Sequence, residues 1–213
     1  MDLFPKDPTK IRARIRRYER ALRKEHDETG YYSDGYGKRY WLGPLYLLMD
    51  DLEGALQSFA WYEETFPDDT GHPMQFLCWT LALYRSGQLE PAKQKLRQTM
   101  LSDLYFIPRL LGMEQQDLDV SHGTNVNEIF ELEDTPPEIF ALWDDAALHW
   151  AHETYNSPEL RQVHNRYVDI QRQLKTEPRG PKRTQLVDEA LNSGTNRRDG
   201  SFSYRNQAAR TKI

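Results

Sequence analysis

The chain has a single cysteine among its 213 residues, Cys78, so it cannot form a disulfide within itself. It also has no apolar run near the ~20 residues that cross a bilayer, and its first residues lack an apolar stretch of the signal-peptide kind. These absences argue against a disulfide-rich secreted protein and against a membrane protein, and they favour a cytoplasmic one. Aromatic residues, at 12%, are frequent enough to supply a sizeable core.

Short catalytic motifs are missing as well. The sequence contains no P-loop, no dinucleotide-binding glycine fingerprint, no Gly-x-Ser-x-Gly turn and no Cys-x-x-Cys pair. Asp145, His149 and His152 fall on one face of a predicted helix, but zinc proteases need two histidines four residues apart with a glutamate directly after the first. We interpret these three residues as a solvated polar face. The sequence therefore predicts no enzyme, no catalytic residue, no metal site and no cofactor.

What the chain does have is a distinctive spacing of small and bulky residues: Leu42, Gly43, Tyr46, Ala55, Phe59 and Pro67. Gly43 and Ala55 would let two antiparallel helices approach closely. Tyr46 and Phe59 would fill the seam between them. Pro67 would end the second helix, because proline cannot continue the hydrogen-bond ladder. The pattern thus predicts a tight helical hairpin.

A looser copy follows at an offset of 37 residues, where Ala92 aligns with Ala55 and Leu96 with Phe59. In the turn of this copy, Gly87 would supply left-handed backbone. Over about residues 36–108 the chain resembles the tetratricopeptide repeat (TPR) family. It departs from the family at Arg39, where a Trp is usual, and at Thr80, where a Gly is usual. The resemblance implies an all-α fold of antiparallel hairpins, stacked as a short TPR-like right-handed solenoid.

Local signals divide the rest of the chain. Asp7 and Pro8 predict a helix start, and the helix should stop before Gly30. The expected organisation, in chain order, is a basic N-terminal helix (1–30) packing on the body, two TPR-like helix pairs (36–108; helices 38–49 with 51–66 and 73–86 with 89–105), an irregular connection (109–135), a third helical hairpin (136–176), and a polar, largely disordered basic tail (177–213) with a short helix at 183–192.

Charge is strongly segregated along the chain, although the net charge is only −5. Residues 1–24 hold nine Lys and Arg against three Asp and Glu, and residues 176–213 hold eight against four. The intervening body is correspondingly acidic. Either the basic ends fold back on this body or pair with it in a homodimer, or they reach an acidic partner.

Proteins of the TPR family hold an extended or helical peptide in a concave groove lined by the first helix of each pair. The resemblance therefore implies a partner-binding groove at Tyr40, Pro44, Leu47, Leu77, Leu81, Tyr84 and Arg85. These residues are mainly apolar, so an amphipathic helix suits them better than a terminal carboxylate. Acidic rims would select basic partners. The chain's own apolar stripe of Ile11, Ile15, Tyr18 and Leu22 could equally fill the groove.

Two functional hypotheses follow. The first is a TPR-like protein–protein interaction module or adaptor that binds a protein or peptide segment in the apolar groove, without catalysis. The alternative is a factor associated with nucleic acid or the ribosome, which would dock through the N-terminal helix. The residues expected to contact phosphate in that case are Arg12, Arg16, Arg17, Arg20 and Arg23.

Overall fold

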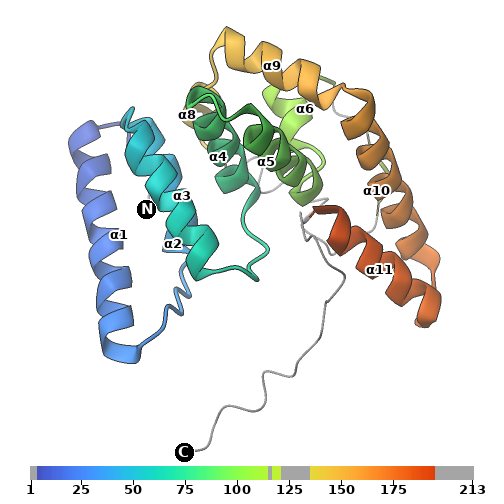
Figure 1. Cartoon of the computed structure of the whole chain (residues 1–213), viewed down its shortest axis with the longest axis horizontal. Coiled ribbons are helices and arrows are strands. Elements are labelled where there is room, and N and C mark those ends of the chain that lie inside the picture. The colour runs from blue at the N-terminus through green and yellow to red at the C-terminus, as the bar shows by residue number, and fades with distance from the viewer. Residues whose placement is uncertain (1–3, 115–116, 121–134, 195–213) are drawn as a thin grey trace, which may run out of the picture.

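The computed structural model describes residues 4–114, 117–120 and 135–194. Within these ranges the protein consists of ten helices packed against one another, with no strand. The expected all-helical class is confirmed. The helices follow one another along an arch, with α1 at one end and α10 and α11 at the other (Figure 1). Their bounds are α1 (Pro8–Thr29), α2 (Lys38–Leu48), α3 (Leu52–Thr65), α4 (Pro73–Arg85), α5 (Leu89–Ser102), α6 (Phe106–Leu110), α8 (Pro137–Phe140), α9 (Asp145–Tyr155), α10 (Pro158–Thr176) and α11 (Pro181–Gly194).

Helix α1 has the start and the end that the sequence predicts. The Asp7 carboxylate accepts a hydrogen bond from the backbone N–H of Thr9 at 2.8 Å, Pro8 occupies the first turn, and Gly30 ends the helix in left-handed backbone. The apolar stripe of Ile11, Ile15, Tyr18 and Leu22 is buried. Helix α1 packs by this stripe beside α2, so its basic side chains are left on the other faces.

Helices α2 and α3 form the first hairpin, and Gly43 explains how closely they pack. A Cβ atom added to Gly43 would lie 2.2 Å from the ring of Phe59 on α3, well inside van der Waals contact. Ala55 is fully buried. In the turn, the Asp51 side chain caps α3 by accepting from the Gly54 N–H at 2.8 Å. The seam predicted from the small residues is therefore present.

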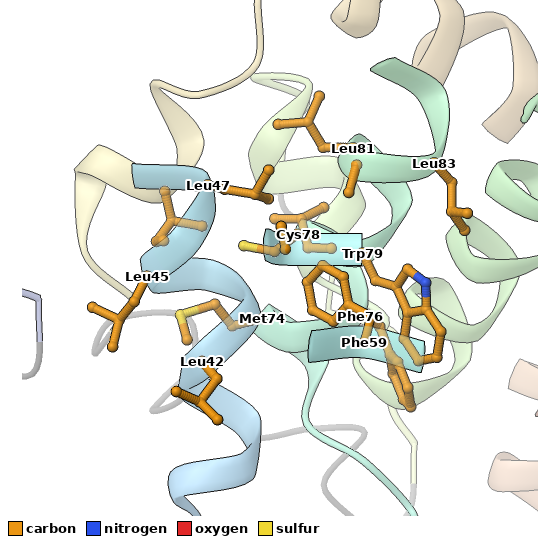
Figure 2. Close-up of a cluster of buried hydrophobic side chains, with 14 of the residues drawn as sticks. Leu42, Leu45, Leu47, Phe59, Met74, Phe76, Cys78, Trp79, Leu81 and Leu83 are labelled. Carbon is orange, nitrogen blue, oxygen red and sulfur yellow. The ribbon is translucent and has the colours of Figure 1, made fainter. Parts of the chain in front are cut away.

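Helices α4 and α5 form the second hairpin. Gly87 adopts the expected left-handed backbone in the turn, with φ of 77°. Thr80, at the position where the family usually has Gly, is fully buried and donates its hydroxyl to the Phe76 carbonyl at 2.8 Å. Its own helix thus satisfies the polar group that replaces Gly. Both α2 and α3 pack on α4, and Figure 2 shows leucines of α2 interleaved with Met74, Cys78 and Leu81 of α4.

Beyond α5 the sequence-based boundaries needed correction. Helix α5 was expected to reach residue 105, but it ends at Ser102 because Asp103 is extended, with φ of −152° and ψ of 116°. The Asp103 carboxylate then accepts from the Tyr105 N–H at 2.8 Å and starts α6. Pro108 lies in the first turn of α6, where its missing N–H has no partner to lose.

The third hairpin was also expected to begin with one continuous helix from residue 136. That helix is divided: α8 is a single turn, and α9 starts afresh at Asp145 with the Asp144 side chain accepting from the Ala147 N–H at 2.8 Å. Ser157 caps α10, with its side chain accepting from the Leu160 N–H at 3.4 Å. Helices α9, α10 and α11 all pack against α5. The described part of the expected tail contains α11, which covers the predicted helix at 183–192; the rest of the tail and most of the predicted irregular connection lie outside the described residues.

Candidate functional site

The apolar members of the expected groove belong to the protein core. Leu77 and Leu81 are 0% exposed, Leu47 is 2% exposed and Pro44 is also buried. The three leucines belong to one buried cluster with residues from much later in the sequence, including Ile139 on α8. Of the two alternatives that the sequence left, a groove open to a partner is therefore corrected, because the chain itself buries these positions. Its polar and aromatic members, Tyr40, Tyr84 and Arg85, are partly exposed.

A segment of the chain itself covers this side of α2 and α4. Helix α8 packs against α2, and the Arg85 guanidinium donates to the carbonyl of Leu142, just after α8, at 2.6 Å. The ring of Tyr84 lies 4.9 Å from that of Trp150 on α9. From the sequence, the N-terminal stripe was one of two expected occupants of the groove, the other being a partner segment. The stripe packs beside α2 instead, and the expected groove is covered by the segment from α8 to α9.

Tyr40 takes part in a polar network that joins two loops. Its hydroxyl donates to Asp69 at 2.8 Å, and Arg39 pairs with Asp69 at 2.6 Å and with Asp34 at 3.3 Å. Asp34 lies in the loop between α1 and α2, and Asp69 lies in the loop between α3 and α4. Arg39 also lies over the rings of Tyr40 and Phe66, with its guanidinium carbon 4.2 Å and 4.9 Å from the two ring centroids. Burial opposes ionisation of Asp69, but hydrogen bonds from Gly71, Tyr40 and Arg39 outweigh it and hold the pKa of Asp69 below its ordinary value. The network is a structural tie between the loops.

The basic face of α1 is the most pronounced exposed feature of the described structure. We use this name for seven exposed basic side chains between residues 10 and 24 of the helix: Lys10, Arg12, Arg16, Arg17, Arg20, Arg23 and Lys24. Lys24 forms an ion pair with Glu28, at 3.6 Å within the same helix. The five arginines make no ion pair with any described residue, and Arg17 contacts only the ring of Tyr18. All five expected phosphate contacts are thus exposed together on one helix.

A cleft of about 270 Å³ lies beside this face, between α1 and α3. We call it the α1–α3 cleft. It is lined by Glu19, Leu22, Arg23, Tyr32, Leu42, Tyr46, Gly54, Gln57, Ser58 and Trp61. The Tyr46 hydroxyl donates to Glu19. Burial of the Tyr46 hydroxyl and its bond to the Glu19 carboxylate both raise the pKa of Tyr46.

The sequence did not predict the α1–α3 cleft. Its one local signal was that Glu19 is the only acidic residue between residues 8 and 24, a stretch rich in arginine. A lone carboxylate in such a stretch would ordinarily be interpreted as an internal ion pair. In the structure it faces the cleft, because it lies four residues after the buried Ile15 and three before the buried Leu22, at the edge of the apolar stripe.

The other residues weighed from the sequence form no site in the described structure. Within residues 4–114, 117–120 and 135–194 no group of three His, Cys, Asp or Glu side chains is arranged to hold a metal ion. His152 approaches only its neighbour Glu153, at 3.5 Å. Cys78 is fully buried in the core, and burial raises the pKa of its thiol.

No helix of the described residues combines the length and the apolar character that crossing a membrane requires. Comparison with protein-family models, with curated proteins and with solved structures gave no match. The candidate functional site is therefore defined by its geometry alone: the basic face of α1 and the α1–α3 cleft beside it.

Proposed function

We propose that this chain is a helical-hairpin module of TPR-like architecture that binds nucleic acid through the basic face of α1, without a catalytic step. The observation that carries the proposal is that Arg12, Arg16 and Arg20 are exposed and form no ion pair with any described residue; Arg20 donates only to the backbone carbonyl of Arg16 in its own helix. Like charges gathered on one face repel one another, and this repulsion is relieved when a polyanion binds. The TPR-like part of the proposal is supported by the close packing at Gly43 and by the full burial of Ala55 and Ala92.

The spacing of the arginines suits a phosphate backbone. Arg12, Arg16 and Arg20 follow one another at four-residue intervals, and each interval rises about 6 Å along the helix axis. Guanidinium groups form paired hydrogen bonds to phosphate oxygens, which makes arginine the preferred side chain for this contact. The row can therefore meet successive phosphates along one strand.

The alternative of a peptide held in an apolar groove receives less support. A partner would have to displace the segment that starts at α8, whose Ile139 is 0% exposed, before it could reach Leu77 or Leu81. The unbound protein buries this segment, so the free energy needed to expose it would oppose binding of the partner. No such rearrangement is needed at the basic face of α1.

The proposal can be tested by fluorescence anisotropy with a labelled U20 RNA and the full chain. The logarithm of the binding constant should fall linearly with the logarithm of the salt concentration. Arg16→Glu should weaken binding by about tenfold at low salt and reduce the slope by about 0.7, the value for one contact to a single strand. Arg179→Glu is the matched control, because Arg179 is exposed in the turn between α10 and α11, far from α1 (Figure 1).

Two results would overturn the proposal. One is no binding of RNA or of single-stranded DNA at about 50 mM salt, conditions under which electrostatic binding is strong. The other is an equal loss of affinity in Arg16→Glu and Arg179→Glu, which would trace the effect to net charge and not to the basic face. Circular dichroism of both variants checks that the helices remain folded.

A further inference from the structure

The α1–α3 cleft combines a carboxylate, aromatic walls and a cationic rim. The carboxylate of Glu19 accepts a hydrogen bond from Tyr46 through one oxygen, and no described residue donates to its other oxygen. Trp61 and Tyr32 form the aromatic wall, with 5.4 Å between their ring centroids and nearly perpendicular ring planes. Arg23 belongs both to the rim of the cleft and to the basic face of α1. A ligand phosphate on that face would lie next to the cleft.

The shape and the charge of the cleft select the kind of group that can enter. A volume of about 270 Å³ is ample for one aromatic heterocycle. A cationic group would gain from Glu19, but it would be opposed by the unpaired charges of Arg20 and Arg23 on the same helix. A neutral, flat group attached to a phosphate could contact the aromatic wall, donate a hydrogen bond to Glu19 and place its phosphate near Arg23. Unpaired bases of single-stranded nucleic acid are read in this way, by stacking on aromatic side chains and by hydrogen bonds to their Watson–Crick edges.

Glu19 determines which base fits. An ionised carboxylate only accepts hydrogen bonds, so it pairs best with two donors side by side. Guanine presents its N1–H and its N2 amino group next to each other. Cytosine and adenine present one amino donor beside an acceptor nitrogen, and uracil presents one N–H between two carbonyl acceptors. Only guanine therefore offers the carboxylate a second donor.

We propose that the α1–α3 cleft takes an unpaired guanine base, with the N1–H and the N2 amino group donating to the Glu19 carboxylate and Trp61 contacting the ring. The inference rests on the proposed binding of nucleic acid to α1 and specifies its base preference. Phosphates on Arg20 and Arg23 would hold the strand, while Glu19 would distinguish the base. Tyr46 holds the carboxylate in place through its hydroxyl.

The test uses the full chain and three RNA nonamers that differ only at the central position: U4-G-U4, U4-inosine-U4 and U9. Inosine keeps the N1–H of guanine but lacks the N2 amino group. The wild-type chain should bind the guanine nonamer roughly tenfold tighter than U9, in the range that a paired base contact provides, with inosine in between. The deoxy nonamers dT4-dG-dT4 and dT9 show whether the preference extends to DNA.

Glu19→Gln should abolish the guanine preference, since an amide offers one acceptor and one donor. Its glutamine oxygen can still accept from Tyr46, so the fold is retained. Asp27→Asn is the matched control: it removes one negative charge from an exposed site of the same helix, outside the cleft, and should keep the preference. The readout is the ratio of dissociation constants within each variant, which cancels any general change in electrostatic affinity.

The outcomes separate the two proposals. Equal binding of all three nonamers by the wild-type chain, or a preference that survives Glu19→Gln, would overturn the guanine site and leave binding to α1 standing. If no nonamer binds even at low salt, both fail. A preference for guanine that is lost in Glu19→Gln and kept in Asp27→Asn supports the site.

Discussion

The ring of Phe59 lies flat against the indole of Trp79, with 5.2 Å between the ring centroids and 6° between the planes. Phe59 belongs to α3 and Trp79 to α4, so this pair joins the first hairpin to the second. The same Phe59 ring also fills the space above Gly43. One side chain thus serves both the contact within a hairpin and the contact between hairpins.

The Phe59–Trp79 contact should show energetic coupling. Phe59→Leu and Trp79→Leu should each destabilise the fold, and the double variant should lose less than the sum of the two. We expect a coupling free energy of about 0.5–1.5 kcal/mol, as for other aromatic pairs. Urea unfolding of the four proteins measures it. A coupling near zero would mean that the two rings stabilise the hairpins independently.

Gly43→Ala should destabilise the protein, although alanine is the better helix former. The added Cβ would lie 2.2 Å from Phe59, so the ring or a helix must shift, and such overpacking costs about 1–3 kcal/mol. Urea unfolding measures the change. Gly180→Ala is the control, because nothing lies within 4 Å of the site of its Cβ and its stability should change little. A neutral or stabilised Gly43→Ala would show that the helices pack less closely than described.

Stability should fall as the solution is acidified from pH 6.5 to pH 4, because of His72. Burial lowers the pKa of His72 to about 4, whereas in the unfolded chain it stays near 6.5. Between these values the unfolded state binds the extra proton, so protons favour unfolding and stability rises with pH. The full shift corresponds to about 3 kcal/mol.

The matched variant is His72→Asn, since asparagine can still cap α4 in place of the His72 ring, which accepts from the Met74 N–H at 3.2 Å. Urea unfolding at several pH values should show a flatter profile for this variant. A residual slope is expected from His164, whose pKa burial also lowers. His149→Asn, at an exposed position, should keep the wild-type profile; an identical flattening there would refute the assignment.

Ile139→Ala should cost about 2–5 kcal/mol, although α8 is only one turn long, because Ile139 is 0% exposed. Thermal or urea unfolding provides the measurement. Glu138→Gln serves for comparison: it removes the largely exposed pair with Lys6, in which the two charged groups lie 2.7 Å apart, and surface pairs of this kind contribute little to stability. Similar losses in both variants would mean that α8 is held mainly by charge.

The helices that could be predicted are those with strong local signals. Asp7 and Pro8 started α1 where expected, and Gly87 turned the chain between α4 and α5 as expected, because caps and left-handed glycines act within a few residues. The division between α8 and α9 was missed, since the apolar spacing runs through it. Only the side-chain cap from Asp144 marks the new start.

The site was harder to predict because it depends on contacts between distant parts of the chain. Leu77 and Leu81 have the helical spacing of groove residues, and nothing near them indicates that Ile139 belongs to the same buried cluster. The five arginines were found because exposure follows from their place opposite the apolar stripe. The role of Glu19 needed the position of α3, which no local pattern provides.

The packing of α8 against α2, in one buried cluster with residues of α4, has a consequence for dividing the protein into fragments. In an ordinary repeat array, neighbouring units can be removed and the remainder still folds. Here Leu47, Leu77 and Leu81 share one buried cluster with residues that follow α6 in the sequence, such as Ile139 on α8. A fragment ending after α5 would expose these leucines to solvent, and we expect such a fragment to aggregate. We therefore expect the two hairpins to fold as parts of one cooperative unit, and a shortened form of the protein should keep α8 and α9 together with them.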